Sequence, residues 1–245
     1  LLVTGVQTCA LPISQMNVEA LKKQAAVEAV NEIKDEKVIG LGTGSTTRYA
    51  VEEIGLRLKD GRLRDIVGVA TSENTRELAE RVGIPLMNIN DVEKIDLTID
   101  GADEVDDNLQ LVKGRGGALF REKMTELLTT KFIVIVDQTK RVSKLGEKCP
   151  IPVEVVRFGY LSTQRRLSQF GTPVLRSDPH DSGKPYVTDN GNYILDLAVS
   201  GGIEDPAKMD RDLKTVTGVV DHGIFINMAT KVIIAAEAGI QVMTK

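Results

Sequence analysis

The chain has little of the side chains on which several classes of function depend. Its 245 residues include no Trp and only 4% aromatic residues, so platforms that stack nucleic-acid bases are not expected. A net charge of −4 gives no electrostatic footprint for nucleic acid, although a local basic pocket for a small anion stays open. The two cysteines, Cys9 and Cys149, cannot form a disulfide framework, which favours a cytoplasmic protein.

Histidine and long apolar runs are scarce too. His180 and His222 are the only histidines, and without a cluster of His and Cys a zinc or other soft-metal site is not expected. Neither has a Ser or Cys elbow beside it, which argues against a nucleophilic triad. No apolar run reaches the roughly 20 residues of a membrane-spanning helix, so we expect no membrane partner.

The length allows one large domain or two of ordinary size. Residues 1–15 are mildly apolar without a preceding basic residue, so they make a poor signal peptide. A helical pattern follows abruptly, from Asn17 to Ile33. We therefore predict that residues 1–15 are a non-native tail and that the natural chain starts at Met16.

After this helix, predicted strands alternate with helical patterns. The strands are indicated by apolar, β-branched runs at residues 37–41, 66–70, 95–99 and 132–136. This alternation is typical of an α/β fold with a mostly parallel sheet and right-handed crossovers. We assign residues 16–148 and 218–245 to this domain.

The pattern changes near Cys149. A β-α-β-β-α order over residues 149–217 predicts a smaller α+β domain with antiparallel strands, inserted into the first. Within it, the pair Asn190-Gly191 is a strong turn signal and predicts a hairpin over residues 186–199.

A glycine-rich stretch, Gly-Leu-Gly-Thr-Gly-Ser-Thr at residues 40–46, joins the first predicted strand to a helix. It fails as a dinucleotide fingerprint because Ser45 stands where the third glycine belongs, and no Gly-Lys-Ser/Thr of a Walker loop is present. What remains is a helix N-terminus whose free N–H groups, with the hydroxyls of Thr43, Ser45 and Thr46, could hold a phosphate. A tight turn capped by Ser45 is equally consistent with the sequence.

An acidic loop, Asp-Gly-Ala-Asp-Glu at residues 100–104, follows the strand at residues 95–99. Ligands of open α/β sheets bind at the carboxyl ends of strands. Carboxylates clustered near apolar walls raise one another's pKa, which suits proton transfer by Asp100, Asp103 or Glu104. The same oxygens could bind Mg²⁺, and a solvated acidic loop is a further interpretation.

Two lysines and a glutamate complete the candidates. Lys113 precedes a glycine loop and could neutralise an oxyanion or pair with the acidic loop. Lys140 follows the strand at residues 132–136, and it could either bind an anion or be an ordinary surface lysine. Glu122 lies on the polar side of a predicted helix, and periodicity does not distinguish it from Glu126, so a solvated position is the simpler expectation.

Four motifs together resemble the ribose-5-phosphate isomerase A family over Met16 to Lys245. They are the glycine stretch at residues 40–46, Asp-Gly-Ala-Asp-Glu at residues 100–104, Lys-Gly-Arg-Gly-Gly-Ala-Leu with Arg-Glu-Lys at residues 113–123, and Val-Thr-Asp-Asn-Gly-Asn at residues 187–192. Each motif is weak alone, but four in order are specific. Arg115 stands where some members carry glycine.

The resemblance implies a Rossmann-like domain with a smaller ferredoxin-like one. It also implies an aldose-ketose isomerase of the non-oxidative pentose phosphate pathway that interconverts ribose 5-phosphate and ribulose 5-phosphate, without a cofactor, as a homodimer or tetramer. The alternatives are a Mg²⁺-dependent phosphoryl-transfer enzyme and a catalytically silent sugar-phosphate sensor. The presence of both Glu122 and Lys113 argues against the sensor.

The resemblance also implies roles for single residues. Glu122 matches the base that moves a proton between C1 and C2 through an ene-diolate, and Lys113 matches the cation near the oxyanion. Asp100 and Asp103 match residues of the ring-opening and hydroxyl-proton steps. The implied substrate-binding residues are Thr43, Gly44, Ser45, Thr46, Asp100, Gly101, Ala102, Asp103, Lys113, Gly114, Arg115, Gly116 and Lys140. The phosphate is expected at Ser45, Thr46 and Lys140, with Lys22 as a further contact.

Overall fold

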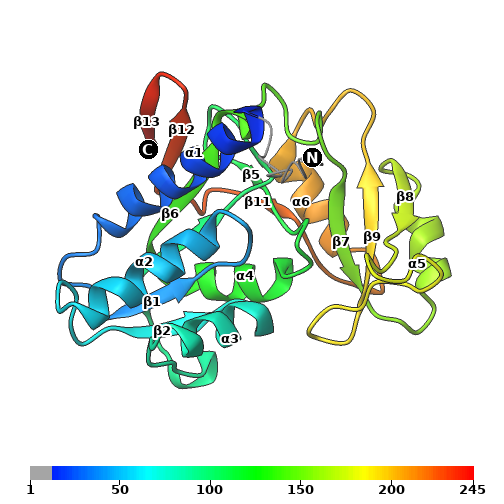
Figure 1. The fold of residues 1–245 in the computed structure, drawn as a ribbon. Coiled ribbons are helices and arrows are strands. Elements are labelled where there is room, and N and C mark those ends of the chain that lie inside the picture. Colours follow the sequence, from blue (N-terminus) through cyan, green and yellow to red (C-terminus); the bar gives the residue numbers. More distant parts are fainter. Residues whose placement is uncertain (1–12) are drawn as a thin grey trace, which may run out of the picture.

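The structure, a computed structural model, describes residues 13–245 of the chain (Figure 1). The strands of its largest sheet are β1 (Val38–Leu41), β2 (Val67–Ala70), β3 (Ile95–Gly101), β6 (Thr129–Asp137), β12 (Lys231–Ala236) and β13 (Gly239–Thr244). Their order is β13-β12-β6-β3-β1-β2, and all neighbours pair in parallel except β12 and β13. The predicted α/β fold with a mostly parallel sheet is confirmed.

Helices connect the strands of the molecule and pack on its sheets. They are α1 (Ile13–Val30), α2 (Thr47–Lys59), α3 (Glu73–Arg81), α4 (Leu119–Leu127), α5 (Tyr160–Leu167) and α6 (Pro206–Lys214), with short 3-10 turns η1 (Ile89–Asp91) and η2 (Gln138–Lys140). Helix α1 begins four residues before the predicted Asn17. Of the predicted tail, residues 1–12 lie outside the described part of the chain. In residues 13–245, no helix is both long and apolar enough to span a bilayer.

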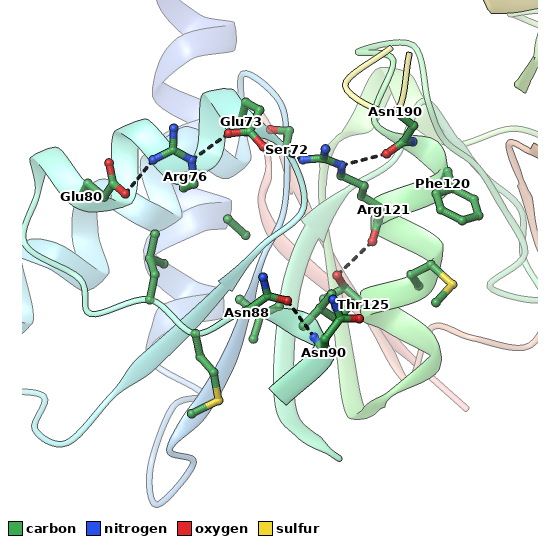
Figure 2. Close-up of a pocket in the computed structure, with 16 residues that line it drawn as sticks. Ser72, Glu73, Arg76, Glu80, Asn88, Asn90, Phe120, Arg121, Thr125 and Asn190 are labelled. Atoms are coloured by element: carbon green, nitrogen blue, oxygen red, sulfur yellow. Dashed lines mark hydrogen bonds and ion pairs between the residues drawn. The ribbon is translucent and has the colours of Figure 1, made fainter. Parts of the chain in front are cut away.

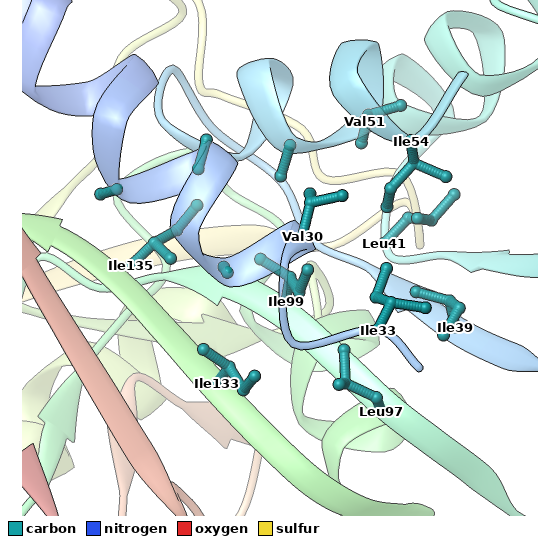
Figure 3. Packing of buried hydrophobic residues seen from close by; sticks show 14 of the residues in the cluster. Val30, Ile33, Ile39, Leu41, Val51, Ile54, Leu97, Ile99, Ile133 and Ile135 are labelled. Carbon is teal, nitrogen blue, oxygen red and sulfur yellow. The ribbon is translucent and has the colours of Figure 1, made fainter. Parts of the chain in front are cut away.

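Alternation along the strands builds two cores, one on each face of the large sheet. Ile133 and Ile135 of β6 point toward α1 and α2 and join the cluster drawn in Figure 3. Phe132 and Val134 point the opposite way. On that face they pack against a three-stranded sheet of β4 (Glu104–Val105), β5 (Leu111–Val112) and β11 (Ile224–Phe225). The large sheet is therefore buried on both faces, as its continuous β-branched sequence requires.

The smaller antiparallel sheet has the order β10-β7-β9-β8. Its strands are β7 (Ile151–Val155), β8 (Thr172–Leu175), β9 (Tyr193–Ala198) and β10 (Val219–His222). With α5 and α6 they follow the order β-α-β-β-α-β, which agrees with the expected ferredoxin-like arrangement. The predicted boundary at residues 217 and 218 stays a prediction, but β10 pairs with β7, so this sheet continues past it.

One local prediction is wrong. Residues 186–190 form no hairpin arm, because β9 pairs with β7 and β8 on its two sides and Asn190-Gly191 turns within a loop before it. Outside the predicted strands, Leu86 makes an isolated parallel bridge to Gly68 at the sheet edge.

The strand order places three loops together. Strands β1, β3 and β6 are neighbours in parallel, with Leu41 beside Ile99 and Gly101 beside Ile135. The chain leaves β1 toward one edge of the sheet and β3 toward the other, so a topological switch point lies between them. The glycine stretch, the acidic loop and Lys140 therefore meet at one edge of the sheet.

Candidate active site

A cavity of about 390 Å³ lies at these strand ends, within the usual size range of small-molecule sites. It is lined by Thr43, Gly44, Ser45, Thr46, Thr47, Gly101, Ala102, Asp103, Lys113, Gly114, Arg115, Gly116, Glu122 and Lys140. The structure thus brings together every predicted substrate-binding residue except Asp100 and the further contact Lys22, and it adds Thr47 and Glu122.

A second cavity, of about 580 Å³, lies between α3 and the outer side of α4 (Figure 2). Its charged groups are paired with one another: Arg76 contacts Glu73 and Glu80, and Arg121 contacts Glu73. These pairs leave no uncompensated charge for an anionic ligand. The smaller cavity is the stronger candidate because buried acid and base groups line it.

Lys113 is the centre of the smaller site. Its Nζ lies 3.0 Å from Asp100 Oδ2, 3.5 Å from Glu122 Oε2 and 3.4 Å from Glu126 Oε1. It also donates a hydrogen bond of 2.6 Å to the carbonyl oxygen of Gly101. The side chain is only 2% exposed. A buried ammonium group among three carboxylates is thus fixed in position at the wall of the cavity.

This arrangement shifts the pKa of each partner. Burial alone would lower the pKa of Lys113, but the charges of Asp100, Glu122 and Glu126 raise it, so the ammonium form is retained. Burial raises the pKa of Glu122 to about 8 against the opposing effect of Lys113, while Asp100 and Asp103 raise it further. Burial also raises the pKa of Glu126 well above its usual value.

The two glutamates of α4 correct an expectation. A solvated position was the simpler interpretation for Glu122 and Glu126, yet both are buried. Their i, i+4 spacing places them on the same helix face, which turns toward Lys113 rather than toward water. The i, i+4 spacing is the only feature of the sequence that could have linked Glu126 to Glu122. It does not show whether the shared helix face is buried or exposed.

The acidic loop is not solvated either, and its three carboxylates have different surroundings. Asp100 lies behind Lys113, fully buried, and Oδ1 accepts the N–H groups of Thr43 and Gly101. Asp103 lines the cavity and accepts the N–H of Arg115 at 2.9 Å. The predicted direct role of Asp100 stays a prediction, since its carboxylate acts on the site through Lys113 and the backbone around it.

Glu104 faces away from the cavity. Its carboxylate accepts backbone N–H groups of Gly146, Lys148 and Cys149 at 2.5, 2.7 and 2.9 Å, and thereby fixes that loop. Glu104 therefore does not converge with Asp100 and Asp103. Over residues 13–245 no group of three or more His, Cys, Asp or Glu side chains is arranged to hold a metal ion.

The other end of the cavity is the N-terminus of α2. Its N-cap residue is Thr46, which makes no side-chain cap, so the structure does not support the alternative of a turn capped by Ser45. The hydroxyl of Thr43 is already occupied by Thr71 and Ser72. The N–H groups of Arg48 and Tyr49 already donate to the carbonyl oxygens of Gly44 and Thr46. The backbone just before them, the hydroxyls of Ser45 and Thr46, and the Lys140 side chain remain for an anion.

Two predicted features lie elsewhere. Lys22 of α1 forms an ion pair with Glu19 at 2.7 Å and does not line the cavity. The motif at residues 187–192 forms the loop before β9, and Asp189 accepts the N–H of Glu73 at the start of α3 at 2.8 Å. This motif links the smaller sheet to the large domain rather than lining the smaller cavity.

Comparisons with known proteins agree with this geometry. Residues 67–239 match the family model described as ribose 5-phosphate isomerase A (phosphoriboisomerase A). The chain is 48% identical over 230 residues to the ribose-5-phosphate isomerase A of Deinococcus radiodurans, covering 94% of this chain and all of that one. It is 50% identical over 231 residues to a probable chloroplastic ribose-5-phosphate isomerase 3 of Arabidopsis thaliana, covering 92% of this chain and 83% of that one.

Solved structures give the same result. A D-ribose-5-phosphate isomerase in complex with phospho-erythronic acid superimposes with a TM-score of 0.91 at 44% identity, covering 94% of this chain and 100% of that one. Ribose 5-phosphate isomerase A of Methanocaldococcus jannaschii gives a TM-score of 0.87 at 39% identity, covering 93% and 99% of the two chains. This chain belongs to the ribose-5-phosphate isomerase A family.

Proposed function

We propose that this chain interconverts D-ribose 5-phosphate and D-ribulose 5-phosphate by proton transfer through an ene-diolate. The observation that carries the proposal is the buried pair of Glu122 and Lys113, a carboxyl group with a raised pKa beside a retained ammonium. A base whose pKa lies near neutrality and an adjacent cation are the two groups that this reaction needs.

The two ends of the cavity suit the two ends of the substrate. The N-terminus of α2, with Ser45, Thr46 and Lys140, supplies N–H groups, hydroxyls and a positive charge for the phosphate. The reacting C1 and C2 then lie near Glu122 and Lys113. A related D-ribose-5-phosphate isomerase was solved in complex with phospho-erythronic acid, which supports a phosphorylated sugar derivative as the ligand of this cavity.

The steps follow from this placement. Glu122 removes the proton from C2 of the open-chain aldose, a double bond forms between C1 and C2, and O1 gains negative charge beside Lys113. Glu122 then returns the proton to C1, and the hydroxyl proton of O2 is transferred to O1. Asp103 lines the cavity and is the carboxylate placed to carry that hydroxyl proton. Asp100 acts as a positioning residue that holds Lys113.

The Mg²⁺-dependent alternative is less compatible with these residues. It needs Asp100, Asp103 and Glu104 to converge, but Glu104 binds three backbone N–H groups of another loop. The ammonium of Lys113 also occupies the position beside Asp100 where a cation would bind. A sensor without activity would have no need for a buried base such as Glu122.

The experiment compares Glu122→Gln with the parent enzyme in EDTA. We expect kcat to fall by about 10²–10⁴-fold, the usual contribution of a general base, because the amide cannot accept the proton. Ribulose 5-phosphate formation from ribose 5-phosphate gives the rate. The matched control is Glu126→Gln, one helical turn away and equally buried, which should keep much more of the activity. An inactive parent, or Glu122→Gln with near-parental kcat, would contradict the proposal.

A further inference from the structure

One wall of the candidate active site is a short glycine-containing loop, residues 114–117, that follows Lys113. Gly114, Arg115 and Gly116 line the cavity. The large domain holds the loop at one point, where the N–H of Arg115 donates to Asp103. The opposite side of the loop faces the smaller sheet, and the contacts there have no part in the mechanism derived above.

Arg176, the residue after β8, makes most of these contacts. Its Nη1 donates to the carbonyl oxygens of Gly114 and Arg115 at 3.1 and 3.0 Å. Its Nε and Nη2 donate to the carboxylate of Asp196 on β9 at 2.9 and 2.5 Å. The guanidinium fork is thereby fixed by Asp196 on one edge and holds two consecutive loop carbonyls with the other.

Tyr186, between β8 and β9, completes the contact. Its hydroxyl donates to the carbonyl oxygen of Gly116 at 3.3 Å. A Cβ on Gly117, whose φ is +83°, would lie 2.1 Å from the same hydroxyl. The close approach of Tyr186 therefore explains the glycine at this position, and three consecutive carbonyls of the loop are drawn toward the smaller sheet.

Peptide geometry gives these contacts a consequence for the cavity. In a trans peptide the C=O and the next N–H point in opposite directions. The carbonyl of Gly114 points to Arg176, and the N–H of Arg115 points across to Asp103, as this rule requires. The carbonyl of Arg115 also points to Arg176, so the N–H of Gly116 is directed to the cavity side, where it can donate to a substrate oxygen.

We propose that Arg176, fixed by Asp196 and assisted by Tyr186, is a positioning residue that holds the loop at residues 114–117 in its substrate-binding conformation. The smaller domain then contributes to sugar-phosphate binding without touching the substrate. This inference rests on the proposed function for its substrate. The positioning role can nevertheless be tested separately from the proposed function, because loss of the Arg176 contacts leaves Glu122 and Lys113 in place.

The test is Arg176→Gln, assayed with ribose 5-phosphate over a range of concentrations. Displacing a binding wall weakens substrate binding, so we expect KM to rise about tenfold while kcat changes by less than about threefold. A merely structural role predicts the opposite, because partial unfolding lowers the amount of active enzyme and hence the apparent kcat at constant KM. Arg176→Lys keeps the positive charge but lacks the planar guanidinium that donates to the loop and to Asp196 at once. We therefore expect KM to remain raised in this variant as well.

Controls separate this proposal from the proposed function. Arg165 lies on helix α5, which packs on the same sheet. Its exposed side chain makes no hydrogen bond or ion pair within residues 13–245, so Arg165→Gln should leave KM unchanged. An active parent with an unchanged KM in Arg176→Gln would overturn the positioning role alone. If Arg176→Gln does not fold, Asp196→Asn and Tyr186→Phe take its place: a raised KM supports the proposal, and parental KM values in both overturn it.

Discussion

At the scale of single residues, Glu122 is the group whose chemistry depends most on its surroundings. It lies on a nine-residue helix, but its side chain is only 4% exposed and its carboxyl group contacts the Lys113 ammonium. Burial disfavours its charged form, and the neighbouring carboxylates add to this effect. A glutamate with an ordinary pKa would be a weak base toward a carbon acid, so the burial is what makes Glu122 suitable for proton abstraction.

The raised pKa predicts a pH dependence of the reaction. Glu122 must be ionised to act as a base, and its pKa is raised to about 8, so kcat/KM should increase with pH and level off above that value. Lys113 should not add an alkaline decline in this range, because its pKa is raised too. Initial rates at low substrate from about pH 5 to 10 measure the profile. A midpoint near the ordinary glutamate value would contradict the prediction.

The sequence alone predicts the positions of the candidate site residues better than it predicts their burial. Lys113 follows β5 of the three-stranded sheet, but Asp103 and Lys140 follow strands of the large parallel sheet. The position of these two residues at one edge of that sheet could therefore be predicted from the alternation of strands and helices. The burial of Glu122 could not, because it depends on Lys113 arriving from another strand to meet the same helix face. Helical periodicity identifies a face but does not say what packs against it.

At the scale of elements, α4 joins the active site to the smaller sheet. Glu122 faces the cavity, and the next residue, Lys123, is buried toward β10. Lys123 Nζ donates to Asp221 Oδ1 at 2.6 Å and to the carbonyl oxygen of His222 at 2.7 Å. This anchor fixes the rotation of α4 about its axis, and therefore the direction of the Glu122 side chain.

His222, at the end of β10, predicts how stability depends on pH. Burial lowers its pKa to about 3, and the charge of Lys123 lowers it further. In the unfolded chain the pKa is about 6.5, so between the two values only the unfolded state binds this proton. Stability should therefore rise with pH across this window and be lost as pH falls through it, by about 1.4 kcal/mol per pH unit.

The measurement compares urea unfolding of the parent and of His222→Gln at about pH 7.5 and pH 5. Other groups titrate in the same range, so the informative quantity is the difference between the two proteins. We expect the parent to lose about 2 kcal/mol more than the variant between these pH values. Equal losses in both proteins would show that His222 does not make this contribution.

The wrong hairpin prediction also belongs to this scale. Asn190-Gly191 does form a turn, but Thr188, Asn190 and Asn192 donate their side chains to one buried oxygen of Glu154 on β7. The loop is thus organised around a buried carboxylate, which replaces the cross-strand pairing that a hairpin would provide. A turn signal specifies local backbone geometry, and it cannot specify such a partner 34 residues or more away in the sequence.

At the scale of the whole molecule, the site forms where the large domain meets the smaller antiparallel sheet. Gly223 links them: it accepts the N–H of Lys113 and donates its own N–H to Pro152. A Cβ at this glycine would lie 2.1 Å from the carbonyl oxygen of Lys113, so no larger residue fits without movement. The composition and strand pattern predicted two domains, but contacts between segments so distant in sequence were visible only in the folded chain.

Assembly is the remaining prediction at this scale. The family resemblance predicts a homodimer or a tetramer, and the smaller domain offers a surface for it. Phe158, just before α5, is 95% exposed, and Val156 and Leu161 close to it are exposed as well. Exposed apolar side chains gathered in one place are typical of protein interfaces. We therefore expect this surface to be buried between subunits.

The variant Phe158→Ser tests this assignment by light scattering coupled to size-exclusion chromatography. The parent should elute with twice the mass of one chain or more, and the variant should shift toward the monomer at equal concentration, because an aromatic anchor at an interface contributes strongly to association. The matched control is Leu127→Ser at the end of α4, which is 66% exposed but lies on a different element. Dissociation by the control and not by Phe158→Ser would place the interface on α4 instead.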